Sequence, residues 1–379
     1  MRAPRSEYMH WAKNQAPVRF HLGSSEVAHF RLDRLPLAIA DLELDGASHY
    51  RYPPLREAIA AKAGVAAENV VMADGASMAN FLALAALVEA GDEVLVEHPV
   101  YEPMMAAASW LGASIARFRR RAETGFPLDP AEVEAALTPG TRLILITNLH
   151  NPGGSLADEA VLREIGAMAE RVGALILVDE AYLDAAPGAR SAAHLGPAFV
   201  ATGSLTKVHG LSGLRCGWIL ADPELAERMW RLNDLFGVAQ AHQAERLSCI
   251  ALAHLDEIMA RTHALLDRNR ALANAFFASR GDVEAAPMVA GITAFPRYAG
   301  DVDRLNLLVR DKYDTSIVPG HWFGLDDHFR IGIGGPTEMV EEGLERLGKA
   351  MDELGSGPSA GGGRDGLDFV VRQGARRER

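Results

Sequence analysis

A single lysine in a loop rich in glycine and serine is the feature of this sequence with the clearest chemical potential. The loop reads SLTKVHGLSGLRCGW, and Lys207 follows Ser204 by three residues and precedes Arg215 by eight. A lysine that forms an imine must reach a buried pocket and lose its proton readily, which desolvation and neighbouring cations favour. The Ser204 hydroxyl and the planar Arg215 guanidinium suit an anchored phosphate. The alternative is a surface loop with an ordinary solvated lysine.

An acid follows directly on a second apolar segment. The run LILVDEAY begins at Leu175 and places Asp179 at its end, with Tyr182 three residues further on. Open α/β sheets bind their ligands at the carboxyl ends of the strands, where this acid would lie. Asp179 can hold a heterocyclic nitrogen protonated, and Tyr182 can reach the same ring. The alternative is an acid that caps the following helix.

Two weaker motifs also follow predicted strands. In TNLHNPGG, a tight turn at Pro152 and Gly153 would direct the amide of Asn151 inward, although an Asn-Pro turn without chemistry explains the same letters. In ADGASMA, Gly75 and Ser77 stand where a helix opens, and the free backbone donors of a helix start can cradle a phosphate. Taken alone, this second motif resembles any helix start.

The elements that must position these residues alternate between strand and helix from about residue 70 to 220, which is typical of a parallel sheet covered by helices. The predicted strands are 70–73, 93–96, 143–147, 175–178, 199–202 and 216–220, and the clearest helices between them are 77–89, 129–137 and 158–172. Long helices over 224–235 and 244–280 come next. A second, mixed unit follows, with strands 292–296, 315–318 and 329–332 and helices 301–311 and 336–354.

Composition and charge exclude several classes of protein. The 379 residues are 49% hydrophobic with a net charge of -12, which indicates a globular protein and argues against a nucleic-acid binder. The longest apolar run, from Phe81 to Val88, has eight residues, whereas a membrane span needs about twenty. The N-terminus has no apolar stretch of the secretory type, so we expect a cytoplasmic protein without a membrane partner.

The two cysteines do not indicate a metal or disulfide site. Cys216 and Cys249 cannot form a disulfide framework, and neither lies in a cluster with zinc-ligand spacing. We therefore expect both to be reduced and structural, and we predict no metal ion.

Taken together, the motifs resemble those of the class I/II aminotransferases, which are pyridoxal-phosphate enzymes of fold type I related to aspartate aminotransferase. The resemblance spans roughly residues 15–354. It rests on the order of the motifs and on equal intervals of 28 residues from Asn151 to Asp179 and from Asp179 to Lys207. It also includes Tyr101 in HPVY and Arg330 in FRIG.

The resemblance implies an α/β fold with a large domain, whose mostly parallel sheet of the seven-stranded type is covered by helices, and a smaller α+β domain built from both chain ends. The expected division is an N-terminal arm and part of the small domain at 1–45, a cofactor-binding domain at 46–268 and a small C-terminal domain at 269–354. The glycine- and arginine-rich tail at 355–379 is expected to be disordered.

Roles carried over by position give the cofactor site. Lys207 would hold pyridoxal 5'-phosphate as a Schiff base, Asp179 would pair with the ring nitrogen, and Tyr182 would bond the phenolic oxygen; these three form the catalytic set. The remaining cofactor-binding residues would be Asn151 at the phenolic oxygen, Tyr101 on the ring face, and Gly75, Ala76, Ser77, Ser204 and Arg215 at the phosphate.

The same resemblance implies a substrate site and a partner subunit. Arg330 would grip the substrate α-carboxylate, with help from Asn151 and the backbone at Gly23. Tyr50 would reach the phosphate in the partner subunit of a homodimer, with Tyr52 as the competitor for that role.

The implied activity is transfer of an amino group between an α-amino acid and a 2-oxo acid. The alternative is a β-lyase, such as a C–S lyase, or another pyridoxal-phosphate reaction on the same fold, because a fold does not fix a reaction. Arg231 and Arg246 lie where some relatives bind a side-chain carboxylate, but one sequence cannot assign either of them.

Overall fold

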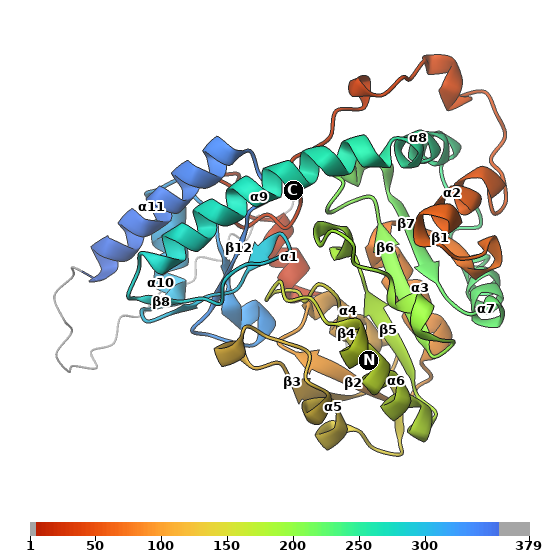
Figure 1. The fold of residues 1–379 in the computed structure, drawn as a ribbon, viewed down its shortest axis with the longest axis horizontal. Coiled ribbons are helices and arrows are strands. Elements are labelled where there is room, and N and C mark those ends of the chain that lie inside the picture. Colours follow the sequence, from red (N-terminus) through yellow and green to blue (C-terminus); the bar gives the residue numbers. More distant parts are fainter. Residues whose placement is uncertain (1–4, 356–379) are drawn as a thin grey trace, which may run out of the picture.

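The computed structural model describes residues 5–355 and shows a large sheet with helices on both faces beside a smaller unit (Figure 1). The long helix α9 (Leu255–Ala278) extends from the sheet to the smaller unit. The tail predicted to be disordered lies outside the described residues, apart from Gly355 at the end of α11 (Thr337–Gly355). In residues 5–355, no helix is both long and apolar enough to cross a membrane.

The large sheet has seven strands, as the family resemblance implied, and their order is β1-β7-β6-β5-β4-β2-β3. The strands are β1 (Val70–Asp74), β2 (Glu93–His98), β3 (Ser114–Arg119), β4 (Thr141–Thr147), β5 (Leu175–Asp179), β6 (Phe199–Ser204) and β7 (Cys216–Leu220). Only β7 runs antiparallel to its neighbours, so the sheet is mostly parallel. The residue pattern predicted six of these strands and missed β3, an edge strand whose SIARFR sequence is largely solvent-accessible.

Alternate residues of a strand point to opposite faces, and both faces of this sheet are buried. In β4, Leu143 and Leu145 pack into the cluster that contains α3 (Gly75–Leu87), while Ile144 and Ile146 pack into the cluster that contains α6 (Glu159–Val172). The central run of β4, Leu143–Ile146, is therefore apolar at every position, which is why the pattern located the strand. The helices α2 (Pro53–Ala63), α4 (Glu102–Trp110), α5 (Pro130–Ala136) and α7 (Pro223–Asn233) complete the large unit.

The smaller unit combines residues from both ends of the chain. Its sheets pair β8 (Val283–Glu284) with β10 (Arg297–Tyr298), and β12 (Phe329–Gly332) with both β9 (Thr293–Ala294) and β11 (Val318–Pro319). The N-terminal segment joins them, since Phe20 bridges to Thr315 and the backbone N–H of Gly332 donates to the Leu22 carbonyl at 2.6 Å. The helices α10 (Val302–Asp311) and α11 cover this unit. The exact domain boundaries remain predictions.

The helix predicted over 244–280 was wrong as a single element. Two helices occupy it, α8 (His242–Ala253) and α9, and they meet at His254, whose φ of -115° and ψ of 25° are not helical. The apolar repeat continues through this one-residue break, so hydrophobic periodicity could not reveal it. The short strand β9 occupies only part of the range 292–296, and β11 shares only Val318 with the range 315–318.

Candidate active site

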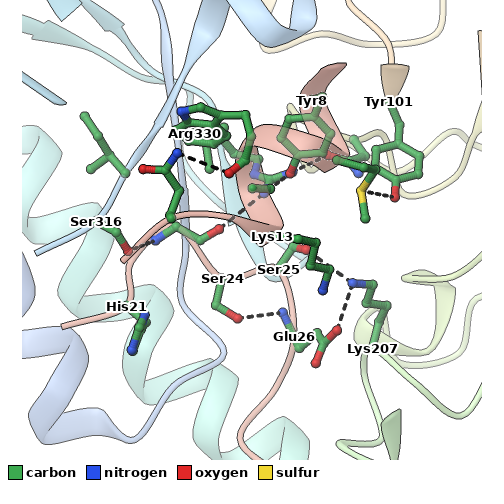
Figure 2. A pocket seen from close by; sticks show the side chains of 18 of the residues that line it. Tyr8, Lys13, His21, Ser24, Ser25, Glu26, Tyr101, Lys207, Ser316 and Arg330 are labelled. Carbon is green, nitrogen blue, oxygen red and sulfur yellow. Dashed lines mark hydrogen bonds and ion pairs between the residues drawn. The ribbon is translucent and has the colours of Figure 1, made fainter. Parts of the chain in front are cut away.

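A cavity of about 340 Å³ lies where the carboxyl ends of the large sheet face the smaller unit (Figure 2). Its lining includes nine of the residues predicted for the cofactor and the substrate. They are Gly23, Ala76, Ser77, Tyr101, Asn151, Asp179, Tyr182, Lys207 and Arg330. Residues from segments far apart in the sequence therefore meet in one pocket. The described residues contain no cluster of three or more histidine, cysteine or acidic side chains that could hold a metal ion.

Asp179 ends β5 and is held rigidly by two donors. Its Oδ2 accepts a hydrogen bond from Nδ2 of Asn80 at 2.7 Å, and its Oδ1 accepts from the Ala181 N–H at 2.9 Å. Burial raises the pKa of Asp179 despite these donors and the nearby Lys207. A cation such as a protonated ring nitrogen would stabilise this buried carboxylate, so the residue fits the partner predicted for it.

Sequence reasoning missed Asn80, although a signal was present. Asn80 lies three residues after Ser77, on the same face of α3, in an otherwise apolar stretch of the helix. A buried amide in such a stretch needs hydrogen-bond partners. Here those partners are the Asp179 carboxylate and the Thr202 hydroxyl.

Lys207 has an acidic neighbour that the sequence did not predict. Its Nζ lies 3.1 Å from Oε1 of Glu26 and 3.4 Å from Oγ of Ser25 (Figure 2). Burial lowers the pKa of Lys207, but Tyr182, Glu26 and Tyr8 together outweigh it, and the pKa is raised. The expectation that neighbouring cations lower the pKa of Lys207 was therefore wrong in this structure. The neighbour is an acid, Glu26, which the fold brings against a lysine 181 positions away.

Arg330 lies on β12 with only 1% of its surface exposed, and it joins the parts of the predicted substrate site. Its Nη1 donates to Oδ1 of Asn151 at 3.1 Å, and its Nη2 donates to the Tyr8 hydroxyl at 3.0 Å and to the Gly23 carbonyl at 3.3 Å. Its Nε has no acceptor among the described residues. A fixed guanidinium with a free donor suits a bidentate carboxylate.

Tyr8 is the second residue that sequence reasoning missed. It lies on the short N-terminal helix α1 (Glu7–Lys13) and is buried beside Tyr101, with ring centroids 6.1 Å apart at 80°. Burial is also the main cause of the raised pKa of Tyr101, so the Tyr101 phenol stays neutral. No local motif marks Tyr8, because its partner Arg330 is 322 positions away.

The predicted phosphate residues gather around the start of α3. Gly75 opens the helix at a φ of +80°, and a Cβ there would clash with the Arg215 guanidinium. Nη2 of Arg215 donates to the Asp74 carbonyl at 3.0 Å, which holds it beside the free N–H groups of the first turn. Ser204 is buried at the end of β6, does not line the cavity and accepts a hydrogen bond from the Thr206 N–H at 3.3 Å.

The two candidate tyrosines for a partner subunit differ in their surroundings, and neither lines the cavity of its own chain. Tyr50 is 47% exposed, and its hydroxyl donates to Oδ1 of Asp234 at 2.8 Å. Tyr52 is buried, and its hydroxyl accepts from Nη1 of Arg246 at 3.0 Å. Arg246 and Arg231 also lie outside the cavity lining, so neither reaches a substrate within this chain.

The family model for aminotransferase class I and II matches residues 13–347. Capreomycidine synthase of Streptomyces vinaceus is 33% identical over 311 residues, which cover 80% of this chain and 79% of that protein.

Two solved structures share the fold. A PLP-dependent aminotransferase from Streptococcus suis has a TM-score of 0.87 and 25% identity, covering 93% of this chain and 99% of that one. A PLP-dependent cyclase, OrfR, has a TM-score of 0.84 and 27% identity, covering 93% and 98%.

Proposed function

The chain belongs to the class I and II aminotransferases, whose cofactor is pyridoxal phosphate, and from this premise we propose that it moves an amino group from an α-amino acid to a 2-oxo acid. The observation that carries the proposal is one cavity that holds a reactive lysine, a buried acid and a carboxylate-binding arginine. These are Lys207, Asp179 and Arg330.

The chain's own residues fit the cofactor. Lys207 would bind it covalently, and Asp179, fixed by Asn80, would hold its ring nitrogen protonated. The start of α3 and Arg215 would bind the phosphate. When bound, pyridoxal phosphate supplies an electron sink for the pair released when an α-C–H bond breaks.

The substrate-side residues orient that bond. Arg330 and Asn151 would hold the α-carboxylate, which fixes the α-carbon relative to Lys207. Tyr8 and Tyr101 line the cavity together, with their rings in edge contact. Lys207, freed by the incoming amine, would take the α-proton on Nζ and hold it for the return transfer that amino exchange requires. Water would release the first product as a 2-oxo acid, and a second oxo acid would take up the amino group by the reverse of these steps.

The proposed enzyme is a homodimer in which Tyr50 reaches the partner's phosphate site. Exposed apolar side chains support this arrangement: Leu235 is 77% and Phe236 57% exposed, on a segment close to the start of α3. The same segment is tied to that helix start, since Nε2 of Gln240 donates to Oδ1 of Asp74 at 2.9 Å. Sedimentation of the purified protein tests the dimer, and a Tyr50→Phe variant with weakened cofactor binding would support the role of its hydroxyl.

A different reaction on the same site is the second candidate. The relatives named above include a synthase and a cyclase. In addition, Glu26 lies beside Lys207, where its acid group would donate a proton to a leaving group on the β-carbon. A β-lyase, such as a C–S lyase, would release ammonia and a 2-oxo acid, whereas a cyclase would keep the amino group.

Product analysis distinguishes the three reactions. The protein is mixed with each of a panel of amino acids in the presence of pyruvate or 2-oxoglutarate, and new amino acids, ammonia and cyclic products are measured by mass spectrometry. We expect the acceptor to become an amino acid. Ammonia or a cyclic product, without exchange to any acceptor, would overturn the proposal.

A further inference from the structure

A carboxylate on the cavity wall has no part in the proposed transfer. Glu26 lies in the loop after Gly23, and 29% of its side chain is exposed, toward the cavity. Its backbone is fixed on both sides, because the Glu26 N–H donates to Oγ of Ser24 at 3.3 Å and the Val27 N–H donates to the Lys207 carbonyl at 2.9 Å. Figure 2 shows Glu26 and Lys207 side by side.

The positive charge beside Glu26 changes when Lys207 reacts with the cofactor. The carboxylates that line the cavity are Asp179 and Glu26, and the proposed function assigns Asp179 to the ring nitrogen. In the structure Glu26 is paired with the Lys207 ammonium. When Lys207 is bonded to the cofactor or acts as the base, its nitrogen is no longer the ammonium that pairs with Glu26 in the structure. A partly buried carboxylate without a cationic partner is costly, so it favours a new cation beside it.

The other cations of the cavity do not replace Lys207 in the structure. Arg330 is held by Asn151, Tyr8 and Gly23, and Lys13 and Arg310 make no ion pair with Glu26. The Arg310 guanidinium instead donates to the Ala16 carbonyl.

Lys13, His21 and Arg310 also line the cavity, but they are not placed to select a side chain as Glu26 is. Exposed charges are screened by water and salt, so these side chains select a substrate only weakly. The Lys13 and Arg310 cations attract anionic groups such as the substrate α-carboxylate on approach.

We propose that Glu26 selects amino donors whose side chain ends in a cation, either an ammonium or a guanidinium; the inference rests on the proposed function. Such a group would lie against the Glu26 carboxylate on the wall of the cavity. It would find there the Glu26 carboxylate and the Ser25 hydroxyl, both of which already contact a nitrogen cation. The α-carboxylate of the same substrate would be held by Arg330.

The test compares donors of different charge in a Glu26→Gln variant, which keeps the shape of the side chain and removes its charge. Glu342→Gln is the matched control, because Glu342 forms an exposed ion pair with Arg346 on α11. Arginine, ornithine and lysine are compared with leucine, methionine and alanine, and kcat/KM is measured from the loss of the bound cofactor's visible absorbance. We expect the unmodified enzyme to prefer the cationic donors. In Glu26→Gln their kcat/KM should fall about 10- to 100-fold, as for a lost charged hydrogen bond, while neutral donors change less than about threefold.

A binding measurement separates this inference from turnover. α-Methylornithine and α-methylleucine lack the α-proton, so their dissociation constants can be read from the cofactor spectrum of the intact enzyme. We expect Glu26→Gln to weaken the first by at least about tenfold and to leave the second nearly unchanged.

Three results would overturn the inference. An equal loss for all donors would show that Glu26 acts on the α-amine or on Lys207, which every substrate shares. No loss, or a preference of the unmodified enzyme for dicarboxylic donors, would show that Glu26 does not read the side chain. If no donor of any class exchanges its amino group, the proposed function fails instead, and the α-methyl compounds still test Glu26.

Discussion

Replacing Asp179 by Asn tests whether the buried acid acts through its charge. The asparagine oxygen can still accept from Asn80 or from the Ala181 N–H, but its amide nitrogen would face the other donor, so one of two hydrogen bonds is lost. That loss costs about 1 kcal/mol of stability, and relief of the buried charge offsets part of it. The fold should therefore survive the substitution.

The effect on the reaction should be much larger. Two opposite charges about 4 Å apart interact by about 4 kcal/mol at an effective dielectric constant near 20. Loss of this stabilisation corresponds to roughly a 1,000-fold fall in rate, at about 1.4 kcal/mol per tenfold.

Rapid mixing with a single amino donor measures this rate from the absorbance of the bound cofactor, and thermal unfolding checks the fold. Asp129→Asn is the matched control, since Asp129 caps α5 by accepting from the Ala131 N–H and asparagine caps equally well. A rate within about tenfold of the unmodified enzyme, with the cofactor fully bound, would refute the assigned role of Asp179.

Three further substitutions have definite expected results. Gly75→Ala should weaken cofactor binding, measured by cofactor titration, because the added methyl group would displace Arg215. Its control is Gly173→Ala, where the φ of +73° is similar but the surrounding space is open, so the variant should lose only about 1 kcal/mol of stability in thermal unfolding. Tyr8→Phe removes an acceptor from the substrate-binding arginine and should lower kcat/KM about tenfold, mainly through KM. Burial raises the pKa of Glu180 to about 8, so between about pH 4.5 and 8 the folded protein binds more protons than the unfolded chain, and its stability falls as the pH rises. In Glu180→Gln the melting temperature should depend less on pH over this range, and an unchanged dependence would contradict this expectation.

The sequence predicted the sheet well because its central strands are buried on both faces. In β4 the run Leu143–Ile146 and in β5 the run Leu175–Val178 are apolar at every position, and polar residues with chemical roles follow these runs. Asp179 and Asn151 could therefore be placed at one edge of the sheet by pattern alone. The edge strand β3 lacks this burial, and its alternating charged residues concealed it.

The residues that were missed depend on contacts between distant segments. Tyr8 meets Arg330 and Glu26 meets Lys207 only because the N-terminal segment packs against the smaller unit and over the cavity. Neither contact leaves a local spacing in the sequence. Asn80 is the exception, because a single amide in an apolar helix stretch can be recognised in advance as a residue that needs a buried partner.

Amino transfer itself is tested by following an isotopically labelled amino group. The protein is incubated with a labelled amino donor and an unlabelled 2-oxo acid, and the label is located by mass spectrometry, with Lys207→Ala as the parallel sample. Amino transfer through Lys207 predicts that the label appears in the amino acid formed from the acceptor, and that it does not appear there in the variant. Label found only in ammonia or in a cyclised donor, or equal transfer by Lys207→Ala, would contradict the account.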